Sequence, residues 1–156
     1  MIVSSLLGYL ARKLDTRSWH LSNLVSFDND HDSHSTTWIE PKVSIIIPTR
    51  DKPKLLRACI ESIRTNTNYS NYELLIVDNL SIESETKDLL AQYESEEISI
   101  LKYPGVFSYS AICNFAATKA TGEYLCFLNN DTEAVSKNWL SSMVEHASIG
   151  SSGLVG

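Results

Sequence analysis

Apolar residues along the chain follow two alternating patterns. Short continuous runs rich in Val, Ile and Leu are typical of strands that are buried on both faces, as in parallel sheets. Longer stretches, in which apolar residues recur every three or four positions, are typical of helices that bury one side. The strands are predicted at residues 43–47, 73–78, 98–103, 124–128 and 153–156, and the helices at residues 53–65, 81–93, 108–120 and 136–144.

Residues near the helix ends support the helices predicted at residues 53–65 and 81–93. Pro53 stands where a first helical residue is expected, since proline lacks the N–H group that would be unpaired there. In the same helix, Leu55 belongs to the apolar positions that recur at helical spacing. Ser81 can cap the next helix, whose first turn would then hold Glu83 and Glu85, where negative charge is favourable.

The alternation of strands and helices predicts an α/β fold with a doubly wound, mainly parallel sheet and right-handed crossovers. Ligands of such sheets bind outside the carboxyl ends of the strands. Polar clusters follow three of the predicted strands: Thr49-Arg50-Asp51, Asp78-Asn79 and Asn129-Asn130-Asp131. The three clusters are therefore expected to converge on one crevice.

The first forty residues are predicted to form a helical leader and a polar linker, followed by a folded part at 41–156. Apolar residues recur at helical spacing within residues 1–14, and the segment is too short to span a bilayer. A helix that packs on its own domain is favoured over a helix lying on a membrane surface, and both interpretations stay open. Residues 26–40 are interpreted as the boundary.

Composition removes several classes of protein. The chain of 156 residues has the length of about one domain, and its formal net charge of −6 has the wrong sign for a domain that grips nucleic acid through phosphates. Its 3 cysteines indicate buried thiols in a reducing compartment and no disulfide framework. With 6 glycines and no glycine-rich phosphate loop, a nucleotide would have to be held in another way.

Two of the polar clusters carry possible chemistry. Asp78, at a strand end, can accept hydrogen bonds from a base or a ribose, although an Asx turn explains it as well. Asn129 and Asp131 offer hard oxygen ligands that suit Mg²⁺ or Mn²⁺ shared with substrate phosphates. An ordinary turn after a strand accounts for them equally well, so the residues alone leave both pairs of alternatives open.

Three segments resemble the inverting family 2 glycosyltransferases of GT-A fold. They are VSIIIPTRD at 43–51, LIVDN at 75–79 and ATGEYLCFLNNDTE at 120–133. A fourth segment, YPGVFSYSAICNF at 103–115, is similar to the rhamnosyltransferase-like branch that builds bacterial surface polysaccharides. The resemblance covers residues 43–156 and implies the Rossmann-like half that binds a nucleotide-diphospho-sugar.

The resemblance also implies roles for individual residues. Asp131 would coordinate Mn²⁺ or Mg²⁺ at the family's D-x-D motif, and Asn129, which replaces the usual first aspartate, should weaken that metal site. Asp78 would hydrogen-bond the base. Leu80 stands where the family commonly has a small or polar residue. The implied donor-binding residues are Pro48, Thr49, Arg50, Asp51, Asp78, Asn79, Asn114, Asn129 and Asn130.

The resemblance further implies a UDP-, dTDP- or GDP-linked sugar as donor and a surface-polysaccharide or lipid-linked acceptor. Inversion needs a general base, which the family places beyond its metal motif and which is expected beyond Gly156. Glu133 and Glu145 are interpreted as solvated residues. We therefore expect a truncated fold that binds donor without competent transfer, in the cytoplasm or peripherally at the inner membrane face.

Two other classes of function remain as alternatives. Receiver domains of signalling proteins are also parallel α/β proteins, but they need a phosphorylatable Asp after the third strand, where this chain has Lys102-Tyr103-Pro104. A degenerate relative that binds a nucleotide, or only a partner, without turnover is the other alternative. A screen of nucleotide sugars distinguishes them best.

Overall fold

A six-stranded sheet organises the computed structural model, which describes residues 9–12, 40–148 and 154–155. The strand order is β4-β3-β2-β5-β1-β6. The first four strands in this order are parallel, whereas β1 runs antiparallel to both of its neighbours. The strands are β1 Tyr9–Arg12, β2 Val43–Thr49, β3 Tyr72–Asp78, β4 Ile98–Lys102, β5 Tyr124–Phe127 and β6 Leu154–Val155.

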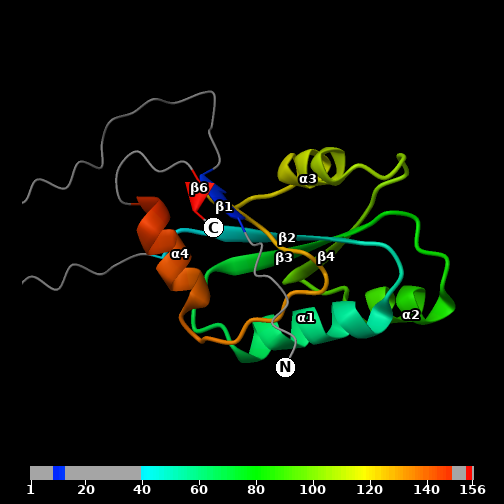
Figure 1. Cartoon of the computed structure of the whole chain (residues 1–156), viewed down its shortest axis with the longest axis horizontal. Coiled ribbons are helices and arrows are strands. Elements are labelled where there is room, and N and C mark those ends of the chain that lie inside the picture. The colour runs from blue at the N-terminus through cyan, green and yellow to red at the C-terminus, as the bar shows by residue number, and fades with distance from the viewer. Residues whose placement is uncertain (1–8, 13–39, 149–153, 156) are drawn as a thin grey trace, which may run out of the picture.

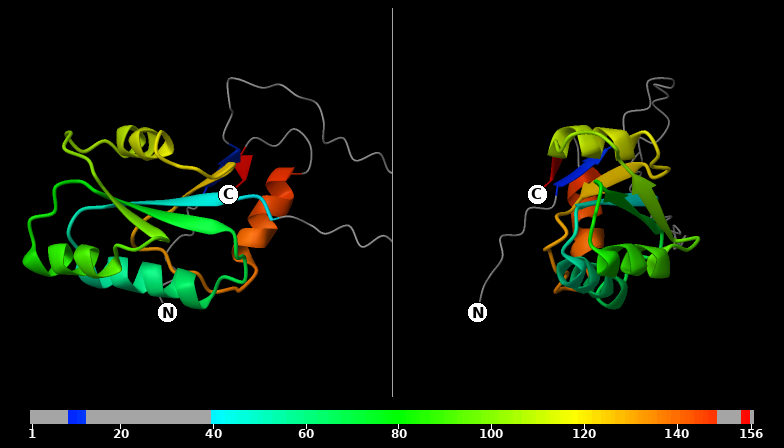
Figure 2. Two further views of the ribbon diagram at one scale, coloured as in Figure 1. Left: turned by 180° about the vertical axis from the view of Figure 1, so that it is seen from behind. Right: turned by 90° about the vertical axis from the view of Figure 1, so that its right-hand side faces the viewer.

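Helices cover both faces of the sheet (Figure 1). Helix α3 lies over one face, and α1 and α2 lie on the other, as the two views of Figure 2 also show. The described helices are α1 Pro53–Thr65, α2 Ser84–Tyr93, α3 Tyr109–Ala117 and α4 Trp139–Ser148. The prediction of a doubly wound, mainly parallel α/β fold is confirmed.

The central strand β2 is buried along its whole length because both faces of the sheet are covered. Side chains of a strand alternate between the faces, so Ile45 and Ile47 join the core beneath α1 and α2, while Ile46 joins the core beneath α3. Burying each such side chain contributes about 1.5–3 kcal/mol. The unbroken run of apolar residues at 43–47 reflects this double burial.

Part of the predicted N-terminal helix is instead a strand. Tyr9–Arg12 forms β1 and pairs with β5, with Tyr9 opposite Phe127 and Arg12 opposite Tyr124. An uncovered β5 would leave a row of backbone groups unpaired, and β1 satisfies them. The strand expected at 153–156 is present at 154–155 and pairs antiparallel with β1. The remainder of the leader and the boundary at 26–40 lie outside the described residues, apart from residue 40.

Two local predictions on the helices are wrong. Helix α2 begins at Ser84, after Glu83 in the N-cap position, so Ser81 does not cap it. Leu55, expected on the buried side of α1, is 46% exposed. The position of Pro53 in the first turn of α1 is confirmed. Among the described helices, none has the length and apolar character needed to cross a membrane.

Candidate functional site

The strand register brings the predicted polar clusters to one edge of the sheet. Thr49, at the end of β2, is paired with Asp78, at the end of β3, which is paired in turn with Lys102. From the other side, Asn130 Nδ2 donates to Thr49 Oγ1 at 3.1 Å. The backbone N–H of Asn79 donates to the Thr49 carbonyl at 2.9 Å. The prediction that the three clusters converge is confirmed.

The backbone has an unusual conformation where the first cluster, Thr49-Arg50-Asp51, leaves β2. Asp51 and Lys52 have φ values of 56° and 60°, in the left-handed region. The Asp51 carboxylate accepts hydrogen bonds from the backbone N–H groups of Ile82 and Glu83, at 2.8 and 3.0 Å. The bond from Glu83 is the main cause that lowers the pKa of Asp51. Asp51 therefore holds the segment that leads into α2, and no side chain caps the helix itself, in contrast to the role that the sequence assigned to Ser81.

Ser81 instead joins the first two clusters. Its Oγ accepts from the backbone N–H of Asp51 at 2.8 Å, and its own N–H donates to Asp78 Oδ1 at 3.0 Å. The Asx-type turn considered for Asp78 is thus present, but it uses only one carboxylate oxygen. No hydrogen bond within the described part of the chain occupies Asp78 Oδ2, which leaves this oxygen available to a ligand.

Asn79 ties this edge to the loop between β4 and α3. It is 2% exposed, and its Nδ2 donates to the carbonyls of Tyr103 and Gly105, at 3.1 and 2.9 Å. Its Oδ1 is buried without a hydrogen-bond partner. The side chain of Asn79 therefore supports the loop, and only its Oδ1 is unused.

The third cluster forms a turn directly after β5. The backbone N–H of Thr132 donates to the Asn129 carbonyl at 3.2 Å, which closes the turn around Asn130 and Asp131. Asp131 is exposed, and none of the hydrogen bonds or ion pairs of the described residues involves its carboxylate. The turn considered as an alternative is therefore real, and it presents the Asp131 carboxylate to solvent.

The side chains at the strand edge can hold a metal ion only together with a bound ligand such as a phosphate group. The described residues hold no group of three or more His, Cys, Asp or Glu side chains that could bind a metal on their own. Mg²⁺ is commonly held by one or two carboxylates together with substrate phosphates and water. Asp131, which lies two residues after Asn129 and has an exposed carboxylate, fits that arrangement and no closed metal cage.

The other predicted donor-binding residues differ in accessibility. Pro48 is buried within β2, and Arg50, which follows this strand, is exposed. Asn114 is exposed on α3, where no hydrogen bond joins it to another predicted site residue within the described ranges. Of these three residues, Arg50 is the one that presents a charged side chain at the strand edge.

Sequence reasoning missed three residues beside this edge. Lys102 ends β4 level with Asp78, and Val106 and Phe107 are 91% and 62% exposed in the loop that Asn79 supports. Lys102 could have been recognised in the sequence as a cation near the end of a predicted strand. Val106 and Phe107 could have been recognised as two large apolar residues that directly follow Pro104-Gly105 and lie outside any predicted helix or strand.

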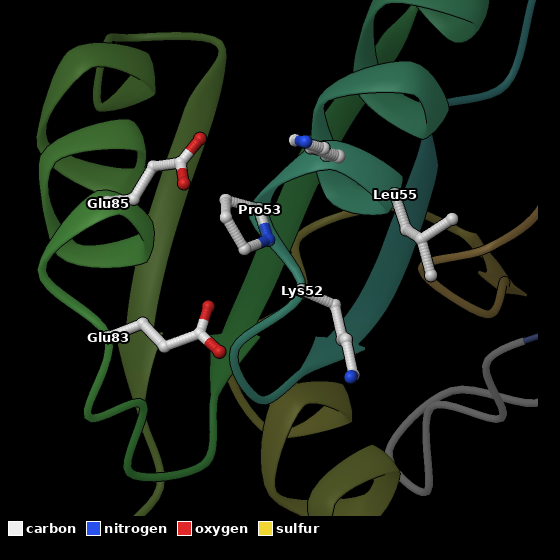
Figure 3. Close-up of a pocket in the computed structure, with 6 residues that line it drawn as sticks. Lys52, Pro53, Leu55, Glu83 and Glu85 are labelled. Carbon is white, nitrogen blue, oxygen red and sulfur yellow. The ribbon is translucent and has the colours of Figure 1, made fainter.

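A cavity of about 240 Å³ lies next to the edge, between the starts of α1 and α2 (Figure 3). Figure 3 shows Glu83 and Glu85 facing Pro53 across it. It is lined by Lys52, Pro53, Lys54, Leu55, Glu83 and Glu85. None of these is a predicted donor-binding residue, so the cavity and the strand-edge site are different places.

The cysteines of the described part are buried, as expected, and free. Burial raises the pKa of both Cys59 and Cys126 to about 12. Such thiols stay protonated at neutral pH, and the nucleophile in cysteine chemistry is the thiolate. These residues therefore fill the core and do not act as nucleophiles.

One protein family matches the part of the chain that contains the strand-edge site. Residues 44–156 match the family described as glycosyl transferase family 2. The chain belongs to this family. The match contains all three strand-edge clusters, and it confirms the family that the sequence motifs indicated.

Curated relatives are longer proteins. The chain is 44% identical over 116 residues to the O-antigen biosynthesis protein RfbC of Myxococcus xanthus, covering 74% of the chain and 9% of that protein. It is 30% identical over 114 residues to GalNAc(5)-diNAcBac-PP-undecaprenol beta-1,3-glucosyltransferase of Campylobacter jejuni, covering 70% of the chain and 36% of that protein. The chain thus spans 9% and 36% of these two relatives.

Solved structures share the fold. The mannosyltransferase PcManGT of Pyrobaculum calidifontis, in complex with GDP-Man and Mn²⁺, is similar with a TM-score of 0.63 at 19% identity, over 72% of this chain and 34% of that one. TarS of S. aureus in complex with UDP-GlcNAc gives a TM-score of 0.56 at 20% identity, over 68% and 31% of the two chains. These likenesses confirm the α/β fold of GT-A glycosyltransferases. The rhamnosyltransferase-like branch stays a prediction.

Proposed function

We propose that the chain binds a nucleotide-diphospho-sugar together with Mn²⁺ or Mg²⁺ at the strand edge, as the donor-binding part of a glycosyltransferase. One observation carries the proposal: Thr49, Asp78 and Asn130 meet at the ends of neighbouring strands, and the exposed Asp131 lies beside them. Family membership supplies the reaction class, and relatives whose names specify transferases supply the type of substrate.

Each residue has a role that follows from its contacts. Asp78 Oδ2 accepts a hydrogen bond from the base, while its other oxygen keeps the turn with Ser81. Arg50 lies where its guanidinium can pair with phosphate oxygens. Asp131 would hold a metal ion together with the diphosphate, and such an ion would supply Lewis-acid stabilisation of negative charge on the nucleoside diphosphate. Asp51 supports the site by holding the backbone of Ile82 and Glu83, just before α2.

The acceptor and the location belong to the same proposal. We infer a glycan or lipid-linked acceptor of surface-polysaccharide synthesis, which the names of the two curated relatives support. A protein of this kind would work in the cytoplasm or at the inner face of the membrane. Glu133 and Glu145 are exposed, and neither lies at the strand ends, so we assign the general base to no described residue.

Thermal unfolding tests the proposal. The parent chain is heated with UDP-, dTDP- or GDP-sugars, with and without Mn²⁺. A nucleotide present at about 100 times its Kd should stabilise the fold by about 2.7 kcal/mol. Asp131→Ala should abolish the metal-dependent part of the stabilisation, because it removes the carboxylate that shares the ion.

Glu133→Ala is the matched control, because Glu133 is an exposed carboxylate two residues further along the same loop. It should respond to metal and nucleotide as the parent does. The proposal is wrong if no nucleotide shifts the midpoint in the presence of Mn²⁺, or if Asp131→Ala responds like the parent. Phosphate incorporation from a small phosphodonor would instead favour the receiver-like alternative.

A further inference from the structure

One face of helix α1 holds the loop that carries Asp131. This loop connects β5 to α4, and it is anchored to α1 at two points. At its start, Cys59 Sγ contacts the Asn129 carbonyl at 3.7 Å. Further along, Ser62 Oγ accepts from the backbone N–H of Ala134 at 2.9 Å, and Asn66 Nδ2 donates to the Ala134 carbonyl at 2.8 Å.

The anchor on Ala134 is well oriented. Both polar backbone groups of this residue are satisfied by side chains of α1, at distances typical of good hydrogen bonds. Ser62 also donates its hydroxyl proton to the Cys59 carbonyl at 2.8 Å, which directs an oxygen lone pair at the loop. Asn66 is held as the C-cap of α1, because its N–H donates to the Ser62 carbonyl at 2.8 Å. The helix therefore presents a preorganised donor and acceptor.

Apolar packing supports this part of the loop only in part, because Ala134 packs against the core but does not fill the space around it. A cavity of about 160 Å³ lies between the loop, the end of α1 and the start of α4, with Ala134, Ile63 and Trp139 in its wall. Val135, the next residue of the loop, is 82% exposed. Near α4 the chain is held by the bond from the Asn68 N–H to the Lys137 carbonyl and by the bond from Trp139 Nε1 to Thr67 Oγ1, each 2.9 Å. Since packing leaves a void beside Ala134, the bonds from Ser62 and Asn66 fix the loop at the point nearer to Asp131.

We propose that Ser62 and Asn66 are positioning residues, which fix the β5–α4 loop so that Asp131 meets the metal and the diphosphate at the strand edge. This inference rests on the proposed function for the role of Asp131. A metal ligand must be held close to its working geometry before the ion arrives, and groups that orient ligands commonly affect metal affinity as strongly as 10- to 100-fold.

The test compares Ser62→Ala, Asn66→Ala and the double variant in the full chain. Hydrogen exchange should become faster at the backbone amides of residues 130–134 in each variant. With saturating UDP, dTDP or GDP, whichever binds the parent, the apparent Kd for Mn²⁺ should rise about tenfold. Nucleotide affinity measured in EDTA should change less than the affinity for Mn²⁺, because Asp78 has no hydrogen bond to this loop and Asn130 keeps its own bond to Thr49.

Two further variants separate positioning from general stability. Ser62→Thr keeps the hydroxyl and should restore both the exchange rate and the Mn²⁺ affinity. Asn68→Ala removes an exposed contact of 3.4 Å between Asn68 Nδ2 and Asn138 Oδ1, two residues beyond Asn66, and should leave both readouts as in the parent. If Ser62→Ala does not fold, Asn66→Ala at the helix end carries the comparison.

The outcomes are distinct. The inference is wrong if amide hydrogen exchange at residues 130–134 is unchanged in both single variants. It is also wrong if exchange becomes faster while the Kd for Mn²⁺ stays equal to that of the parent. A lower midpoint of unfolding with neither of these changes shows a structural role alone and also overturns it. If the parent binds none of the three nucleotides with Mn²⁺, the proposed function fails, and hydrogen exchange then decides by itself whether α1 holds the loop.

Discussion

Leu80 has a left-handed backbone, with φ 61°, and its side chain is 53% exposed. The residue lies between Asn79, which is buried, and Ser81, whose N–H donates to Asp78. The turn that joins these contacts requires the positive φ. A left-handed conformation costs a bulky residue about 1–2 kcal/mol, so a small or polar residue would fit this position better than leucine.

Leu80→Asn should therefore raise the free energy of unfolding by about 0.5–1 kcal/mol, because asparagine tolerates the left-handed region and little buried surface is lost. Urea unfolding at neutral pH measures the change. Ile82→Asn is the control, since Ile82 is 75% exposed in the same loop and does not have a positive φ. Equal effects of the two substitutions would show that backbone strain at Leu80 is not the cause.

At the scale of elements, β2, β3 and β5 are joined at the edge opposite the site. Ser44 Oγ and the backbone N–H of Thr121 donate to Glu73 Oε1, at 2.6 and 2.7 Å, and Lys42 Nζ lies 3.1 Å from Glu73 Oε2. Gly122 belongs to the same contact, because a Cβ there would lie 2.6 Å from the Ser44 backbone nitrogen. The glycine of the ATGEY segment is thus required by the close approach of β2.

Stability should fall in acid because of Glu73. Burial alone raises the pKa of Glu73, but hydrogen bonds from Ser44, Thr121 and Lys42 outweigh it and lower the pKa from 4.5 to about 2. The stabilisation is therefore fully present above pH 4.5 and is lost as the pH falls towards 2. Unfolding by urea across this range should show the loss in the parent.

Glu73→Gln should be less stable than the parent at neutral pH by about 1–3 kcal/mol, and the difference should shrink in acid. Glu145→Gln, at an exposed carboxylate of α4, should follow the parent over the whole range. A constant difference between Glu73→Gln and the parent from pH 7 to pH 2 would contradict this account.

At the scale of the whole molecule, the sheet collects the site from segments that are far apart in the chain. Asn130 contacts Thr49 across 81 positions, and the loop that carries Asp131 is held by α1 across 72 positions. In the proposed function, the exposed carboxylate of Asp131 shares a metal ion with the nucleotide, so metal and nucleotide should depend on each other. Each ligand should therefore bind more tightly when the other is already bound.

Mn²⁺ alone should leave the midpoint of thermal unfolding of the parent unchanged, and the nucleoside diphosphate that binds should shift it more with Mn²⁺ than in EDTA. Linkage requires the converse, so the nucleotide must raise the affinity for Mn²⁺ by the same factor. Isothermal titration in both orders measures the two factors. Tight binding of Mn²⁺ without nucleotide would contradict a site built around a single carboxylate.

The apolar pattern alone was sufficient to predict the parallel core, the strand ends that carry Thr49 and Asp78, and the end of β5 that precedes the turn with Asp131. A run such as residues 43–47 is stable only where both faces are covered, so its burial is encoded locally. The same reasoning was wrong at Tyr9–Arg12, where helical spacing of apolar residues gave way to pairing with β5. The need for that pairing lies in β5, outside the segment itself.

The sequence by itself determined which segments are buried and that polar residues follow the strands. Only the tertiary structure decided which polar groups pair: Asp51 holds the segment before α2, Ser81 joins two loops, and Ser62 and Asn66 hold the loop of Asp131. The physical reason is that hydrophobic burial is non-directional and scales with the apolar surface of a segment, whereas a hydrogen bond needs two atoms in one geometry. That geometry exists only after the strands and helices have packed.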